Sequence, residues 1–184
     1  MRRSGSRPQD GFTLIELLVT ISIAAIMMTL AIPNFMDFLR NNRLAGQAND
    51  FVLACAYAKS EAVKRGLRVT ICSRKNDSTC EASTTWDSGW LVFVDVDGDG
   101  VCDGCGAANP PDTILQVRSP VSDEGGNTLR AGARTRITFQ STGFSQGFND
   151  TFRLCDSRGP AVARQLVVSQ QGRVTATTGT AACP

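Results

Sequence analysis

The sequence predicts an α+β protein in which one long N-terminal helix packs on antiparallel β-sheets. Apolar residues recur at helical spacing from residue 12 to residue 65, and after Gly66 the alternation changes to the period of two that is typical of strands. No helical stretch separates the later strands, which favours antiparallel pairing. We therefore expect a helix over residues 12–66 and a β-rich globular domain over residues 67–184.

The first part of this helix is apolar enough to cross a membrane. Residues 17–36 form a run of 20 without a charged side chain, and about 20 apolar residues span the hydrocarbon core of a bilayer. We expect a transmembrane part over residues 12–36 and an amphipathic part over residues 37–66. Pro33 has no N–H to donate and is expected to kink or loosen the helix.

The end of the helix is marked by its last residues. Lys64 and Arg65 place positive charge at the C-terminal end of the helix dipole, and Gly66 provides a left-handed cap. A helix from residue 12 to residue 65 is roughly 80 Å long, too long for an ordinary globular domain. One half should therefore lie in a membrane or a filament while the other half packs on the β-rich domain.

The remaining chain contains seven segments with strand periodicity. We expect strands over residues 67–73, 90–96, 113–118, 136–140, 151–155, 165–169 and 173–177. Gln170, Gln171 and Gly172 fit a hairpin turn between the last two.

Seven cysteines and no histidine limit the chemistry. The absence of histidine excludes Ser-His and Cys-His catalysis and imidazole metal sites, and this cysteine density indicates disulfides in an oxidising compartment. We expect Cys72 to pair with Cys80, closing a polar loop after a strand, and Cys155 with Cys183. The odd total leaves Cys55 as the free thiol, on the apolar face of the helix.

Two further motifs lie in a Gly/Asp-rich loop. Cys102 and Cys105 form C-x-x-C, which in redox enzymes stands at a helix N-terminus; here the pair either closes a small ring or bonds elsewhere, with a thiol oxidoreductase as the alternative. Asp95, Asp97 and Asp99 read D-x-D-x-D-G, the first half of a calcium loop. Its bidentate glutamate is missing, so no cofactor is expected, and calcium is the alternative to an acidic turn.

Charge is unevenly distributed along the chain. Ten acids and one base lie between residues 76 and 124, whereas seven arginines and two acids follow between residues 125 and 184. Either the surface is polarised or the two segments neutralise each other in the fold.

Residues 11–33 resemble the class III signal of type IV pilins and type II secretion pseudopilins, because G-F-T-L-I-E follows a short basic stretch and precedes an apolar helix. The resemblance implies that residues 1–11 are a leader, that prepilin peptidase cuts after Gly11, and that Phe12 becomes N-methylated. Glu16, four residues beyond Phe12 on the same helix face, would neutralise the N-terminal amine of a neighbouring subunit, since a carboxylate in lipid needs a partner. The alternative is that Glu16 lies at the level of the lipid headgroups and has no partner. Pro33 matches the family's helix-breaking proline.

The rest of the chain looks like the FimT/FimU group of minor pilins. The segments that carry this resemblance are EAVKRG, VTICS, WDSGWLVFVDVDGDG, TILQV and ARQLVVSQQGRV. This group shares a domain family with the secretion pseudopilin GspH. The resemblance implies a non-enzymatic minor pilin that primes type IV pilus assembly and supports twitching motility. Its partners would be other minor and major pilins, the inner-membrane assembly platform and prepilin peptidase. It would span the bacterial inner membrane once, with a periplasmic C-terminal domain, and later reach the pilus tip.

Two alternatives come from the same resemblance. Some proteins of the group bind DNA through G-R-x-R for natural transformation, and here Thr175 stands where the second arginine would be. Arg158, Arg164 and Arg173 are the candidate DNA contacts, which would be sequence-independent and sensitive to salt. The other alternative is a type II secretion pseudopilin.

Overall fold

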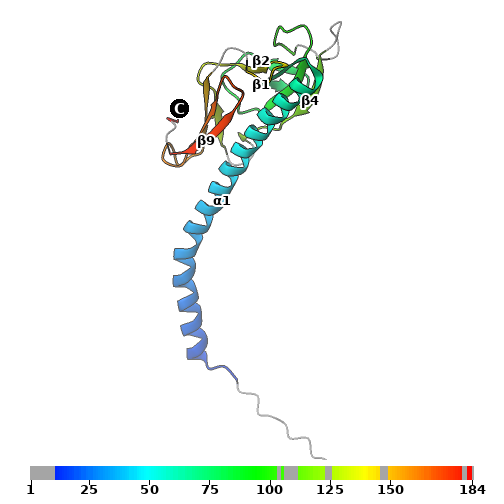
Figure 1. The fold of residues 1–184 in the computed structure, drawn as a ribbon. Helices are drawn as coiled ribbons and strands as arrows, with labels where there is room; N and C mark the ends of the chain where they lie inside the picture. Colours follow the sequence, from blue (N-terminus) through cyan, green and yellow to red (C-terminus); the bar gives the residue numbers. More distant parts are fainter. Residues whose placement is uncertain are drawn as a thin grey trace, which may run out of the picture. The chain divides into compact units, whose positions relative to one another are not determined.

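The computed structural model describes residues 11–102, 105, 112–122, 126–145, 149–179 and 182–183. They form one long helix, α1 (Leu14–Arg65), followed by nine strands (Figure 1). The α+β class predicted from the sequence is therefore confirmed. The chain divides into two compact units, Met1–Arg40 and Asn41–Pro184, and each is described by itself.

Helix α1 begins at a threonine cap. The backbone N–H of Glu16 donates to Oγ1 of Thr13 at 3.3 Å, and the N–H of Leu17 donates to the Thr13 carbonyl at 3.2 Å. Thr-x-x-Glu is the spacing of a capping box, and an acid in the first turn also complements the helix dipole. The helix starts two residues later than the sequence predicted because Thr13 is its cap.

Within the first unit, polar side chains of α1 bond to the helix's own backbone. Four of them donate to carbonyls three or four residues earlier: Thr20, Ser22, Thr29 and Asn34. This arrangement suits lipid, where no water is available to satisfy polar groups. Pro33 lies inside α1, and the helix continues on both sides of it. Among the described residues, α1 is the one helix with the length and composition to cross a membrane.

The second unit contains two antiparallel sheets. In the first sheet the order is β2-β1-β3-β4, and β6 also pairs with β1. The bounds are β1 (Arg68–Asn76), β2 (Thr79–Glu81), β3 (Trp90–Asp95), β4 (Thr113–Val117) and β6 (Arg136–Phe139). β6 pairs with the first half of β1 and β2 with the second half. β3 lies between β1 and β4, and every residue of β3 is buried.

The second sheet has the order β5-β7-β8-β9, so β9 is an outer strand. Its bounds are β5 (Thr128–Arg130), β7 (Asp150–Cys155), β8 (Arg164–Val168) and β9 (Val174–Thr178). The predicted hairpin between the last two strands is present. Gly172 closes its turn with a φ of 68°, a left-handed conformation that glycine adopts without strain, and donates its N–H to the Ser169 carbonyl at 2.9 Å.

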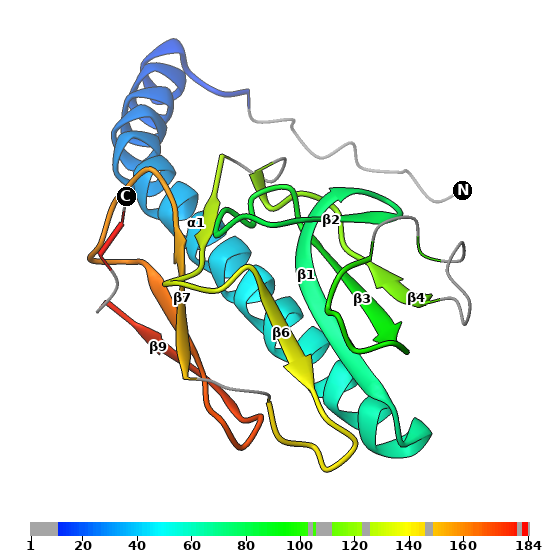
Figure 2. The ribbon, with the colours of Figure 1, turned by 90° about the horizontal axis from the view of Figure 1, so that it is seen from above.

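The amphipathic half of α1 runs behind both sheets and closes one core with them (Figure 2). Phe51 is fully buried, with its ring centroid 5.4 Å from that of Trp90 in β3 and 4.6 Å from that of Phe152 in β7. The opposite face of the first sheet buries Leu91 and Phe93 in a smaller cluster with cysteines. The predicted helix face is therefore the one that joins the two sheets.

Two strands were not predicted, β2 and β5. Each is three residues long, too short for a period of two to be recognised in the sequence. Their extended conformation depends on the long-range partners β1 and β7 rather than on local pattern.

Candidate functional site

The predicted processing site lies directly before α1. Gly11 is exposed, and a Cβ built there would have no atom within 4 Å. Phe12 is 85% exposed. Because both residues precede the first helical turn, the bond between them is accessible to an enzyme.

Glu16 points from the first turn of α1, and its side chain is exposed. Within the described part of the chain, its carboxylate contacts no cation. Phe12 precedes α1, which begins at Leu14, and the pairing of Glu16 with an N-terminal amine stays a prediction. The carboxylate remains open to a partner from another subunit.

Four carboxylates gather at the end of β3. Those of Asp95, Asp97, Asp99 and Asp112 offer oxygens that all lie within 4.8 Å of one another. Sequence reasoning missed Asp112, which precedes β4. The antiparallel pairing of β3 with β4 brings it beside Asp95, and that pairing would have revealed it.

The carboxylates of this cluster hold the turn by hydrogen bonds. Asp95 accepts the Gly98 N–H at 2.8 Å and the Thr70 hydroxyl at 3.1 Å, and Asp112 accepts the Val96 N–H at 2.9 Å. Burial, together with the negative charges of the three other aspartates, raises the pKa of Asp112, although the Val96 hydrogen bond opposes the shift. Calcium binding by Asp95, Asp97 and Asp99 stays a prediction.

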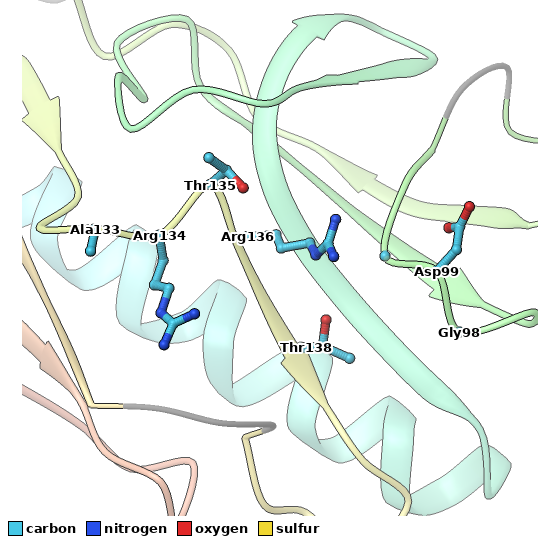
Figure 3. Close-up of a pocket in the computed structure, with 8 residues that line it drawn as sticks. Gly98, Asp99, Ala133, Arg134, Thr135, Arg136 and Thr138 are labelled. Carbon is cyan, nitrogen blue, oxygen red and sulfur yellow. The ribbon is translucent and has the colours of Figure 1, made fainter.

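A polar cavity of 320 Å³ lies beside this turn (Figure 3). Asp99 lines it from one side, and Arg134 and Arg136 line it from the other. Arg136 packs closely on Gly100, where an added Cβ would lie 2.5 Å from its Nε. Arginines of the basic C-terminal segment therefore stand next to the acidic turn.

An ion pair joins the acidic and basic segments elsewhere in the same way. Asp87, from the acidic segment, pairs with Arg130 of β5 and also accepts the Leu129 N–H at 2.7 Å. Both contacts support the interpretation in which the two segments partly neutralise each other.

The cysteines form three disulfides and leave one thiol. The bonds join Cys72 to Cys80 and Cys155 to Cys183, the pairs that the sequence favoured, and Cys102 to Cys105. Cys55 is free and buried, and its burial raises the pKa of the thiol, which disfavours the reactive thiolate.

Among the described residues, no helix begins at the Cys102–Cys105 disulfide. The disulfide follows β3 in the chain and packs with Cys72, Leu91 and Phe93 on the outer face of the first sheet. Cys102 is 1% exposed and Cys105 is half-buried, so this pair covers apolar surface of the first sheet.

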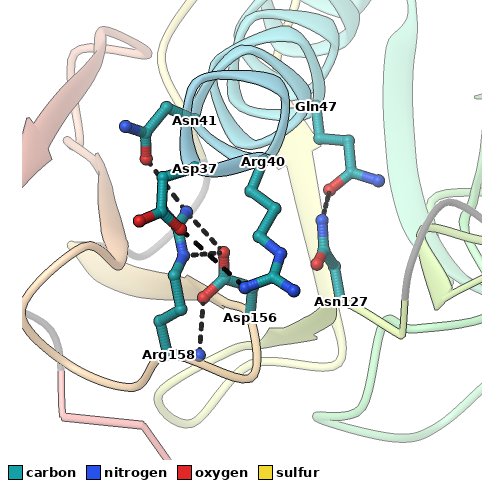
Figure 4. A network of polar contacts seen from close by, with 7 residues as sticks. All are labelled: Asp37, Arg40, Asn41, Gln47, Asn127, Asp156 and Arg158. Carbon is teal, nitrogen blue, oxygen red and sulfur yellow. Dashed lines mark hydrogen bonds and ion pairs between the residues drawn. The ribbon is translucent and has the colours of Figure 1, made fainter. Parts of the chain in front are cut away.

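The three candidate DNA contacts are differently engaged. Arg158 donates to Asp156 at 2.7 Å and to Asn41 of α1 at 2.9 Å (Figure 4). Arg164 donates to the Thr178 hydroxyl at 2.8 Å. Arg173 is exposed at the opposite end of β9, roughly 17 Å from Thr178 at 3.4 Å per residue. They do not form one compact patch, and DNA binding stays a prediction.

Sequence reasoning also missed a buried polar clamp on α1. Asn127 donates to Gln47 at 2.7 Å, as Figure 4 shows, and Gln47 donates to the Val121 carbonyl at 3.0 Å. Gln47 is 2% exposed. Nothing in the amphipathic pattern distinguishes it from a solvated glutamine, because its partners lie more than 70 residues away.

Comparison with known families gives two matches, one to the N-terminal segment and one to the domain that follows it. The family described as Type II transport protein GspH matches residues 47–172, well over half of the chain, and the prokaryotic N-terminal methylation motif matches residues 6–32. The chain belongs to the GspH family. The resemblance found in the sequence is therefore confirmed.

Relatives of this GspH-family chain include pilus proteins. A fimbrial protein of Pseudomonas aeruginosa is 28% identical over 94 residues, which are 51% of this chain and 56% of the relative, so the match spans about half of each. Two crystal structures of the Pseudomonas aeruginosa type IV minor pilin FimU are similar in fold. The first has a TM-score of 0.55 and 22% sequence identity, and the match covers 76% of this chain and 96% of that one. The second has a TM-score of 0.58 and 23% sequence identity, and the match covers 79% of this chain and 96% of that one.

These likenesses support a type IV pilin-like fold in which a long helix packs on antiparallel sheets. Proteins of the GspH pilin family are structural proteins rather than enzymes. The prediction of a non-enzymatic chain is confirmed on that ground.

Proposed function

We propose that this GspH-family chain is a type IV minor pilin that prepilin peptidase cleaves after Gly11 and methylates at Phe12. It then joins the complex that primes pilus assembly or stands at the pilus tip, and it supports twitching motility. The observation that carries the proposal is the joining, in one chain, of the methylation motif to a GspH-family domain with the fold of a minor pilin.

The geometry supports a membrane-anchored subunit. The exposed apolar half of α1 suits the inner membrane and then the packed helices of a filament. Three disulfides in the β-rich part suit an oxidising periplasm. Glu16, open in the single chain, has the charge to meet the amine of a neighbouring Phe12.

Intact-mass measurement tests the maturation step. The full-length chain is expressed with and without an active prepilin peptidase, and membrane fractions are analysed. With the peptidase we expect a species that begins at Phe12 and carries one added methyl group, and Gly11→Val should block its formation. Retention of residues 1–11 beside an active peptidase would refute the maturation proposal.

A type II secretion pseudopilin is the second candidate, favoured by the description of the matching family. The two candidates predict opposite phenotypes for a deletion strain. A minor pilin gives loss of twitching with normal exoprotein secretion, whereas a pseudopilin gives loss of secretion with normal twitching. Complementation with the intact gene is the control for each.

A further inference from the structure

A groove runs along the exposed flank of α1 beside the start of β9. It has a volume of 790 Å³, and its apolar walls come from Val52, Ala56 and Val63 on the helix and from Val174 on the sheet. The Val63 side chain is 54% exposed. This volume falls within the range of about 300–1,000 Å³ that is usual for binding pockets.

The edge of β9 beside this groove is open. The register with β8, and the hydrogen bond from the Ser169 N–H to the Arg173 carbonyl at 2.9 Å, define which groups point toward β8. Bonded and non-bonded pairs alternate in an antiparallel ladder, so the N–H and C=O groups of Val174 and Ala176 point away from β8. These groups have no hydrogen bond to any described residue.

The open edge and the groove are geometrically matched. Val174 and Ala176 share a sheet face with their β8 partners Val168 and Leu166, which are buried in the core that α1 closes. A strand added to β9 would lie about 4.8 Å farther out and place every second side chain on that same face. Those side chains would enter the groove along α1.

The rim of the groove is positively charged. Lys59, Lys64 and Arg173 line it, and no carboxylate is among its lining residues. Lys64 is also ion-paired with Glu61 at 3.5 Å, so the positive charge of the rim rests on Lys59 and Arg173. Lys59 bonds the Gln171 carbonyl at 2.9 Å, which holds its charge at the rim. An occupant with the complementary chemistry carries apolar side chains for the walls and carboxylates for the rim. Nucleic acid would match the charge but neither the apolar walls nor a free strand edge.

We propose that this groove and the open edge of β9 bind an extended, acidic segment of another protein. The segment adds a strand to the second sheet, places apolar side chains against Val52, Ala56 and Val63, and brings its carboxylates to Arg173. The proposal does not depend on the proposed pilus role, because a secretion pseudopilin would present the same groove.

Amide hydrogen exchange on the full-length protein in detergent micelles tests this assignment. The probe is a short capped peptide in which valine alternates with glutamate, and its matched control carries lysine in place of glutamate. We expect the glutamate peptide to slow exchange at Val174 and Ala176 at least tenfold at saturation, and the lysine peptide to have no effect. β5, the other outer strand of the same sheet, should be unchanged.

Matched variants separate the edge, the walls and the rim. Ala176→Pro removes one outward N–H at an edge position where proline is tolerated, and it should abolish peptide binding. Val63→Asp should weaken binding at least tenfold, whereas Leu53→Asp, also exposed on α1 but outside the groove, should not. Arg173→Glu should weaken it, and Lys75→Glu, exposed on β1, should not.

Other occupants would overturn the proposal. Slowed exchange in β9 on addition of duplex DNA, but not of either peptide, would identify a nucleic-acid site. Slowed exchange that grows with protein concentration alone would identify a second copy of the chain. Equal effects of the two peptides, or unchanged binding by Ala176→Pro, would exclude strand addition. None of these results bears on the N-terminal mass that tests maturation.

Discussion

Glu16 contributes to the first turn of α1 through its backbone and carries a charge on its side chain. Its backbone N–H donates to the Thr13 hydroxyl at 3.3 Å, a contact that does not depend on the Glu16 side chain. Its charge, which the described chain leaves without a cationic partner, is needed only if another subunit supplies an amine. The charge can therefore be tested by a substitution that keeps the size of the side chain and leaves the backbone contact in place.

Glu16→Gln tests the charge alone. We expect normal cleavage and methylation, because the residues before α1 are unchanged, but at least a tenfold loss of the protein from sheared pili, because the neighbouring amine is no longer neutralised. Immunoblots of sheared and membrane fractions measure both. Thr20→Val, in the same apolar segment, is the control and should incorporate normally. Normal incorporation of Glu16→Gln would refute the pairing.

Glu61 is a residue whose charge contributes to the stability of the fold. The hydrogen bond from Arg65, at 2.6 Å, and the nearby Lys64 lower the pKa of Glu61. A lowered pKa in the folded state means that the carboxylate stabilises the fold above its unfolded pKa of about 4.3, and that this stabilisation is lost as the pH falls through the folded value. The last turn of α1 is therefore acid-sensitive.

Glu61→Gln should lower the melting temperature at neutral pH and have no effect in strong acid, where the wild-type carboxyl is already protonated. Thermal melts followed by circular dichroism across the acidic range measure the difference. Glu81→Gln, exposed in β2, is the control and should show no pH-dependent difference. A constant difference at every pH would mean that packing rather than charge is responsible.

Among the helices and strands, the sequence predicted the features that depend on residues close together in the chain. The end of α1 at Arg65 follows from Lys64, Arg65 and Gly66, and the β8–β9 hairpin follows from its turn residues. β2, β5 and the clamp between Gln47 and Asn127 depend on partners distant in the chain. Asp112 joined the acidic cluster only once the pairing of β3 with β4 was known. Long-range register is the information that a single sequence lacks.

The Cys155–Cys183 disulfide links β7 to the C-terminal end of the chain. Its cysteines are 28 residues apart, whereas Cys72 and Cys80 are 8 apart. In the chain-entropy account these loops are worth about 3–4 and about 2–3 kcal/mol respectively. Cys183→Ala should therefore lower the free energy of unfolding more than Cys80→Ala, as urea denaturation under non-reducing conditions would measure. The reverse order would show that native packing outweighs loop closure.

At the scale of the whole β-rich unit, Phe51 determines whether the two sheets behave as one domain. Its ring contacts Trp90 of the first sheet and Phe152 of the second, and its ring centroid is 6.1 Å from that of Trp86. Within the described residues, the named strands pair inside their own sheets, but the segment between β2 and β3 also contacts β5 directly. There the Trp86 N–H donates to the Leu129 carbonyl at 2.8 Å. The joint core on α1 adds side-chain packing to this backbone contact between the two sheets.

Phe51→Ala should lower the free energy of unfolding by about 3–5 kcal/mol, the cost of a large buried aromatic. Because one core serves both sheets, the loss should appear as one cooperative transition shifted to lower denaturant. Tryptophan fluorescence reports on Trp86 and Trp90 at this core, and far-ultraviolet circular dichroism reports on both sheets. The two curves should coincide. Leu53→Ala, two residues farther along α1 and 64% exposed, should change stability by less than about 0.5 kcal/mol. Fluorescence that changes before the circular dichroism would mean that the second sheet holds its fold without α1.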